Sequence, residues 1–167
     1  MSDRDEPRAG PVDRGRTHLR AIQGGKQGVR NLDQSGTSRG ADELTLPART
    51  ASARVARHWV MNELAAEGVY GVENQVIELL TGELVANAAL HGPTGGEVRV
   101  RARRAGDTVR VSVRDESTAD PVVRHPEPTA DSGRGMALVE VLAADWGVEH
   151  HGRDGKTVWF DVVIEPD

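Results

Sequence analysis

The sequence predicts an α/β fold in which helices cover one face of a mostly antiparallel sheet. Apolar residues recur with a period of 3.6 between residues 47 and 92, as in amphipathic helices, and with a period of two between residues 98 and 114, as in half-buried strands. Short glycine-containing turns then join two pairs of strands, which is typical of antiparallel hairpins. These observations together predict a two-layer α/β sandwich.

Two helices are predicted in the first half of this domain. The first begins near Pro47, a residue favoured in the first helical turn. Its apolar positions are Val55, Ala56, Trp59, Val60 and Leu64. The second follows Gly68 and Gly71 and ends at Gly92 and Pro93. Its apolar positions are Val76, Leu79, Leu80, Leu84 and Ala88.

Two hairpins and a third helix are predicted in the second half. In the first hairpin apolar residues alternate with arginines or serine, so the sheet has an apolar face and an arginine-rich face towards water. The apolar residues are Val98, Val100, Ala102, Val109, Val111 and Val113. A third helix is expected over residues 136–144. Strands over 146–151 and 157–164, joined by the turn 152–155, form the second hairpin.

Two segments lack any apolar period. Residues 1–40 contain seven glycines, eight basic and five acidic residues and no aromatic residue, a mixture that cannot bury enough surface to offset chain entropy. They are predicted to be a disordered tail, and residues 41–167 are predicted to be the domain. Residues 116–132 contain Pro121, Pro126 and Pro128 and form a long loop, a feature that is often functional.

The composition excludes several classes of function. The chain has no cysteine, so it can form neither disulfides nor thiolate zinc sites, and it has no cysteine nucleophile. Its net charge of -5 argues against a nucleic-acid-binding protein, because such proteins need a basic surface. No apolar run has the roughly 18 residues of a membrane span, and the first residues do not form a signal peptide, so we expect a cytoplasmic location without membrane contact.

The second predicted helix carries a polar stripe. Glu83, Asn87 and His91 recur at positions i, i+4 and i+8 and so lie on one side of the helix. The stripe is either a solvent-facing surface or a face that contacts a ligand.

Two further features could bind a ligand. Asp115 continues the strand alternation, so its carboxylate points to the core and needs a donor, either from a local turn or from a ligand such as the amino edge of adenine. Gly133, Arg134 and Gly135 open a helix, where backbone N–H groups suit a phosphate, although a flexible linker before a helix would look the same.

In this order the motifs resemble those of GHKL ATPases and kinases. The stretch 83–92, Glu-Leu-Val-Ala-Asn-Ala-Ala-Leu-His-Gly, resembles the N box of that family. Asp115 is similar to the G1 aspartate, and residues 132–138, Ser-Gly-Arg-Gly-Met-Ala-Leu, resemble the G2 box. The resemblance covers about residues 45–165 and implies the Bergerat fold. The short length and the Glu-Leu-Val-x-Asn-Ala form are most similar to the stand-alone anti-sigma factor serine/threonine kinases of the B and F type.

The resemblance implies ATP and Mg²⁺ as cofactors. Asn87 would coordinate Mg²⁺, Glu83 would act as the base that orients the attacking hydroxyl group, and Asp115 would read the adenine amino group. Residues 116–132 would form the ATP lid. The remaining nucleotide contacts implied are His91, Ser117, Gly133, Arg134, Gly135, Met136 and Thr157.

The resemblance also implies partners. A kinase of this kind phosphorylates an anti-anti-sigma protein, holds a sigma factor and regulates transcription by exchanging the two; it commonly works as a homodimer, but no surface in the sequence marks an interface. One departure leaves an alternative open. The fullest G1 motif is Asp-x-Gly-x-Gly, whereas residues 115–119 read Asp-Glu-Ser-Thr-Ala. The alternative is a non-catalytic regulator on the same fold that acts by binding partners.

Overall fold

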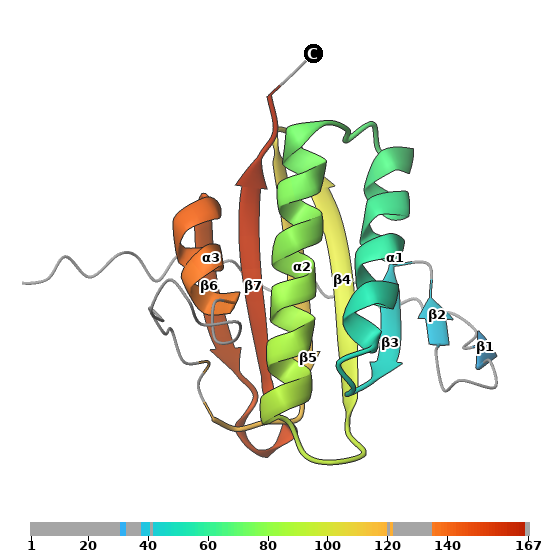
Figure 1. Ribbon diagram of the computed structural model, residues 1–167, viewed down its shortest axis with the longest axis vertical. Helices are drawn as coiled ribbons and strands as arrows, with labels where there is room; N and C mark the ends of the chain where they lie inside the picture. The colour runs from blue at the N-terminus through green and yellow to red at the C-terminus, as the bar shows by residue number, and fades with distance from the viewer. Residues whose placement is uncertain (1–30, 33–37, 41, 120, 122–134, 166–167) are drawn as a thin grey trace, which may run out of the picture.

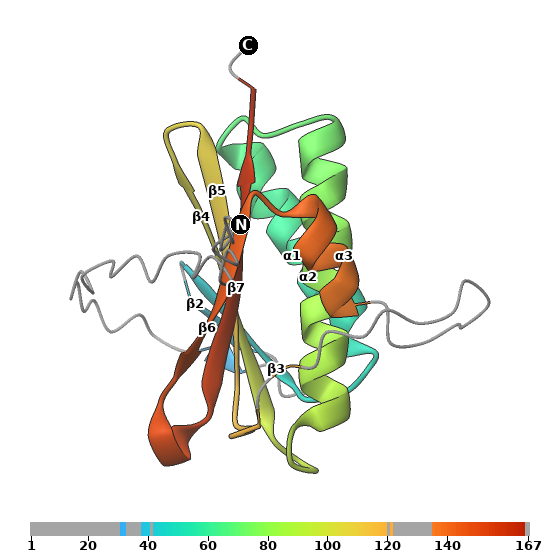
Figure 2. The same ribbon diagram turned by 90° about the vertical axis from the view of Figure 1, so that its left-hand side faces the viewer.

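The described part of the chain folds into two layers, a sheet and a layer of three helices on one of its faces (Figure 1; Figure 2). A computed structural model describes residues 31–32, 38–40, 42–119, 121 and 135–165. The predicted α/β sandwich with helices on one face is therefore confirmed.

The sheet has seven strands among the described residues, and every neighbouring pair is antiparallel. The strands are β1 (Asn31–Leu32), β2 (Ser38–Gly40), β3 (Glu43–Pro47), β4 (Glu97–Ala105), β5 (Thr108–Asp115), β6 (Asp145–His150) and β7 (Lys156–Val163). Their order across the sheet is β1-β2-β3-β4-β5-β7-β6, so the last strand of the chain lies between β5 and β6. A single 3-10 turn, Gly152–Asp154, lies between β6 and β7.

Three helices pack on this sheet. They are α1 (Ser52–Ala66), α2 (Val72–His91) and α3 (Gly135–Leu142). The long helix α2 lies in the middle of the layer, with α1 on one side and α3 on the other (Figure 1). The core between the layers contains aliphatic residues from the helices, such as Leu64, Ile77 and Leu80, and Phe160 from β7, all fully buried. Burying each such side chain stabilises the fold by about 1.5–3 kcal/mol.

The start of the domain differs from the prediction. Helix α1 begins at Ser52, and Pro47 is the last residue of β3, where a proline is tolerated because the strand ends there. Leu44 and Leu46 of β3 are buried. The hydroxyl of Ser52 donates to the carbonyl of Pro47 at 2.6 Å and so ties the strand to the helix. The strands β1 and β2 also correct the prediction of a disordered tail for their five residues; the other residues of the range 1–40 lie outside the described residues.

The face of the sheet away from the helices, which we call the open face, carries most arginines of β4 and β5, as predicted; Arg104 is the exception, because it points to the helix side and donates to the carbonyl oxygen of Glu67 at 2.6 Å. Arg110 donates from Nε and Nη2 to the two carboxylate oxygens of Asp161, both at 2.7 Å, and these hydrogen bonds raise the pKa of Arg110 above its usual value. Its guanidinium also lies 3.8 Å from the centroid of the Trp159 ring. That ring covers Gly147 of β6, where a Cβ would lie 2.7 Å from Trp159 Cζ2.

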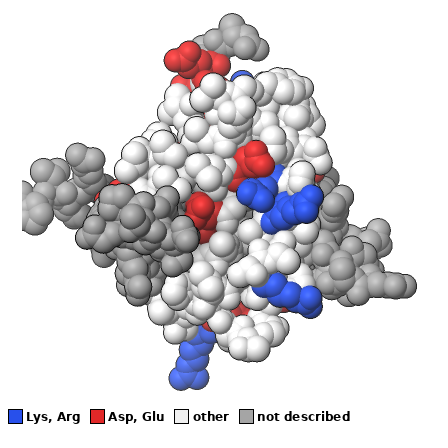
Figure 3. Space-filling model, viewed as in Figure 1, with Lys and Arg blue, Asp and Glu red and all other residues white. Residues whose placement is uncertain are grey.

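On the helix-covered side, most of the surface consists of residues other than lysine, arginine, aspartate and glutamate (Figure 3). Exposed apolar side chains on α2 and α3 contribute to this surface. They are Val72, Leu79, Leu90, Val141 and Leu142. Within the part of the chain that the structure describes, no helix combines the length and apolarity needed to span a bilayer.

Candidate functional site

Glu83 and Asn87 lie on the side of α2 that faces away from α1. Gly82 marks the side towards α1, because Arg57 of α1 packs against it so closely that a Cβ would lie 2.8 Å from Arg57 Cδ. Successive residues of an α-helix are rotated by about 100° around its axis. Measured from the direction of Gly82, Glu83 therefore points roughly 100° away and Asn87 roughly 140° away. Both are half-buried. Helix α3 packs on the other side of α2 (Figure 1), so helix geometry turns Glu83 and Asn87 towards the α3 side.

The ends of the elements bring further predicted residues to the same end of the domain. The C-terminal half of α2, the last residues of β5 and the first residues of β7 lie together there (Figure 1). Asp115 is the last residue of β5 and, like the valines before it, points to the helix side. Asn87 therefore belongs to the helix layer, and the side chain of Asp115 points towards that layer, so the two do not lie on opposite surfaces.

The carboxylate of Asp115 is already bonded within the protein. Its Oδ1 accepts the N–H of Ser117 at 2.7 Å and a hydrogen bond from Lys156 Nζ at 3.1 Å, and its Oδ2 lies 3.1 Å from the same Nζ. Both side chains of the ion pair are 3% exposed. A lysine buried to this degree requires a partner, because an unpaired buried charge costs several kcal/mol.

The turn before β7 places Lys156 opposite Asp115. Gly155 has a φ of 97°, in the region that favours glycine, and a Cβ at this position would overlap the carbonyl oxygen of Asp115. The close approach sets the register in which Asp115 pairs with Lys156 and Arg114 pairs with Thr157. Lys156 is the residue of this site that the sequence analysis missed.

Thr157 lies on the open face, opposite to Asp115. Its hydroxyl is 2.7 Å from His151 Nε2. Neighbouring residues of a strand point to opposite faces, so Thr157 and Lys156 cannot both adjoin the carboxylate. The structure thus places Lys156, and not Thr157, beside the carboxylate of Asp115, while the contact of Thr157 with adenine stays a prediction. The alternation of buried Val158 and Phe160 was the signal that could have assigned Lys156 to the helix side.

The other predicted contacts are only partly described. Ser117 is buried, and its hydroxyl accepts the N–H of Ala119 at 3.3 Å, so two side-chain bonds fix the start of the loop where the G1 glycines are missing. His91 is exposed at the end of α2. Met136 is buried near the start of α3, whose first residue is Gly135. The predicted Gly133 and Arg134, and most of the predicted lid 116–132, lie outside the described residues.

The candidate metal ligand at this site is the amide oxygen of Asn87. No group of three histidine, aspartate or glutamate side chains is arranged to bind a metal ion anywhere in the described ranges. Mg²⁺ is commonly held by one or two protein oxygens plus phosphate oxygens and water, so the amide of Asn87 fits this type of site. The side chains of Asn87 and Glu83 carry no hydrogen bond to another described residue, which leaves their oxygens available.

Comparison with known families agrees with this arrangement of elements. The sequence model of the histidine kinase-like ATPase domain matches residues 46–162, which is more than half of the chain. The chain belongs to the histidine kinase-like ATPase domain family. The match begins in β3 and ends in β7, so it includes all three helices and both hairpins. The resemblance to GHKL ATP-binding domains is thereby confirmed, and the family implies a nucleotide-binding domain.

Solved structures include similar domains. One holds the RsbU and RsbW domains of Rv1364c from Mycobacterium tuberculosis, with 26% identity and a TM-score of 0.53 over 74% of this chain and 33% of that chain. This ATPase domain thus spans about a third of that structure. A histidine kinase domain of the blue-light activated histidine kinase from Erythrobacter litoralis has 25% identity and a TM-score of 0.45 over 71% of this chain and 62% of the other. No curated protein sequence matches the chain significantly.

Proposed function

We propose that this domain binds ATP with Mg²⁺ and transfers a phosphoryl group to a serine or threonine of a partner protein. The observation that carries the proposal is the position of Glu83 and Asn87, which face the α3 side of α2 at the same end of the layer as Asp115. The likeness to a structure with an RsbW domain supports a role in partner switching. The partner is then an anti-anti-sigma protein, exchanged against a sigma factor in the cytoplasm to regulate transcription.

Each of the three residues has a role that its chemistry allows. Asn87 holds Mg²⁺, which when bound neutralises phosphate charge, and Glu83 accepts the proton of the attacking hydroxyl group. Asp115 accepts a hydrogen bond from the adenine amino group. Its Oδ1 already accepts two bonds, from Ser117 and Lys156, but Oδ2 contacts only Lys156 among the described residues. A carboxylate oxygen can accept two bonds, so Oδ2 retains room for one more.

A second candidate function is a non-catalytic regulator that binds partners and uses nucleotide structurally or not at all. The buried pair of Asp115 and Lys156 favours it, because the pair already satisfies much of the carboxylate. The missing G1 glycines favour it too, since Ser117 fixes the loop by hydrogen bonds instead.

Ligand titration separates the two candidates. ATP that binds the folded state raises the melting temperature with concentration, and the stabilisation reaches about 2.7 kcal/mol at a concentration of 100 Kd. We expect this rise with Mg²⁺-ATP. A melting temperature that stays constant would favour the non-binding regulator. Incubation with labelled ATP and candidate anti-anti-sigma proteins then tests transfer, and binding without transfer to any of them would favour the structural role of nucleotide.

Variants on α2 assign the roles. Glu83→Ala should reduce transfer by about 10²-fold or more, the contribution of a general base, while ATP still binds. Asn87→Ala should remove the gain in ATP affinity that Mg²⁺ provides. Glu78→Ala is the matched control, because Glu78 lies on the α1 side of the same helix. Equal loss of transfer in Glu83→Ala and Glu78→Ala would contradict the assigned base.

A further inference from the structure

The arginines of the open face fall into two groups. Three are paired with carboxylates: Arg101 with Glu43 at 2.6 Å, Arg103 with Asp42 at 3.7 Å, and Arg110 with Asp161 at 2.7 Å. Arg99 and Arg114 form no ion pair with any other described residue. Among the arginines of the open face, these two guanidinium groups are therefore the ones that no described carboxylate approaches to ion-pair distance.

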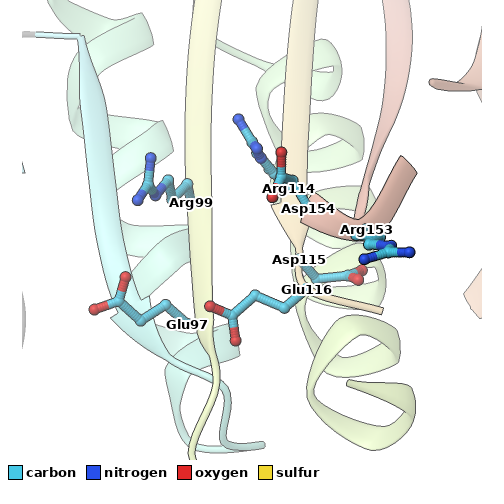
Figure 4. Close-up of a pocket in the computed structure, with 7 residues that line it drawn as sticks. All are labelled: Glu97, Arg99, Arg114, Asp115, Glu116, Arg153 and Asp154. Atoms are coloured by element: carbon cyan, nitrogen blue, oxygen red, sulfur yellow. The ribbon is translucent and has the colours of Figure 1, made fainter. Parts of the chain in front are cut away.

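Arg99 and Arg114 are also direct neighbours. They form a cross-strand pair in the register of β4 and β5, on the same side of the sheet. Like charges placed directly opposite each other in an antiparallel pair destabilise it. Figure 4 shows both arginines on these neighbouring strands, with the helices behind the sheet. An anion bound between them would remove the repulsion.

The two arginines border a hollow that offers further hydrogen-bond donors. Its volume is about 260 Å³, and the hydroxyls of Ser112 and Thr157 and the ring of His151 also line it. Ser112 and Thr157 lie on adjacent central strands, and the contact between Thr157 and His151 Nε2 holds that hydroxyl in place.

Carboxylates restrict where an anion can lie. The hollow with the hydroxyls is also lined by Glu43, which is engaged by Arg101, and by exposed Glu149. On the other side of the two arginines, a second hollow of about 290 Å³ is lined by the acidic residues Glu97, Glu116 and Asp154 and by Arg153. Asp115 also borders it, but its carboxylate points to the helix side. An anion is therefore favoured on the side of Ser112 and Thr157.

We propose that Arg99, Arg114, Ser112 and Thr157 form a binding site for a phosphate group on the open face of the sheet. Guanidinium groups bind phosphate oxygens in bidentate geometry, and hydroxyls donate to the remaining oxygens. Two bidentate guanidinium groups and two hydroxyls offer about six donors, which exceeds the roughly four lone-pair sites of a carboxylate and suits the additional oxygens of a phosphate group. The site needs neither Glu83 nor Asn87, which lie on the helix side, so it does not rest on the proposed kinase activity.

Titration with inorganic phosphate, without nucleotide or Mg²⁺, tests the site. Amide and arginine Nε–Hε signals are followed by NMR, and sodium chloride at equal ionic strength is the reference. Phosphate should shift the signals of Arg99, Arg114 and Thr157, and R99Q and R114Q should each bind about tenfold more weakly, the effect of losing a charged hydrogen bond. R103Q, on the same strand as Arg99 but paired with Asp42, and N87A should bind like the wild type.

Two results would overturn the proposal. One is equal signal shifts in phosphate and in sodium chloride, and the other is unchanged phosphate affinity in R99Q and R114Q. Either variant alone suffices if the other does not fold, since each removes one guanidinium of the site. Phosphoserine in place of inorganic phosphate identifies the source of the group: tighter binding of phosphoserine supports an ester-linked phosphate, and tighter binding of the inorganic ion supports free phosphate.

Discussion

The buried ion pair of Lys156 and Asp115 makes a quantitative prediction about stability. The substitution Lys156→Met keeps most of the side-chain volume but leaves the carboxylate without its cation. Removing one partner of a buried pair costs about 3–5 kcal/mol, and because both side chains are 3% exposed, water cannot replace the lost partner. The N–H of Ser117 still bonds to Asp115, so we expect the lower end, about 3 kcal/mol. The melting temperature should then fall by about 6–12 °C.

Urea unfolding followed by circular dichroism measures this loss. The midpoint should fall while the dependence on urea concentration stays unchanged, because the same surface is exposed on unfolding. Arg103→Met is the control: its pair with Asp42 spans 3.7 Å between side chains 68% and 72% exposed, and such surface pairs contribute less than about 1 kcal/mol. Adding Asp115→Asn to Lys156→Met removes the stranded charge and should restore part of the stability. Equal losses in Lys156→Met and Arg103→Met would refute the reasoning.

Two further substitutions test close packing around the sheet. Gly155→Ala should lower the free energy of unfolding by about 2 kcal/mol or more, because φ is positive there and the Cβ overlaps the carbonyl of Asp115; an unchanged urea midpoint would contradict this close approach. Gly147→Val should displace the indole of Trp159, which covers Gly147, and cost about 1–3 kcal/mol. A shift in tryptophan emission that accompanies the lower urea midpoint would check it, and an unchanged spectrum would count against the described position of the ring.

The regular elements were predictable because their apolar patterns are long. The valines of β4 and β5 alternate over most of each strand, and the pattern of α2 continues over five turns, so a single exception could not change the assignment. The strand β3 was not predicted. Its alternation consists only of Leu44 and Leu46, and Pro47 suggested a helix start more strongly than two leucines suggested a strand. The strands β1 and β2 have only two and three residues, of which Leu32 alone is a large apolar residue, so they form no pattern.

The candidate site was predictable in part for a related reason. Glu83 and Asn87 share a helix face, so their spacing alone places them side by side. The position of Asp115 also follows from the strand alternation. The residue opposite Asp115 depends on the register between β5 and β7. A shift of this register by one residue would place Thr157 opposite Asp115 in place of Lys156 and would move each side chain of the shifted strand to the other face of the sheet. That register is set by the close approach of Gly155 to Asp115, a contact between segments 40 residues apart that no local pattern encodes.

The position of β7 inside the sheet has a consequence for biosynthesis. This strand follows all other described elements in the chain, yet it separates β5 from β6, and β6 has no other strand neighbour among the described residues. The nascent chain can therefore form the antiparallel strands β3, β4 and β5 with α1 and α2 while the ribosome is still translating. The edge of β5 stays unpaired until residue 163 has emerged. During that interval the half-built sheet presents a template for other extended chains, so a ribosome that stalls after residue 150 leaves the domain with an aggregation-prone edge.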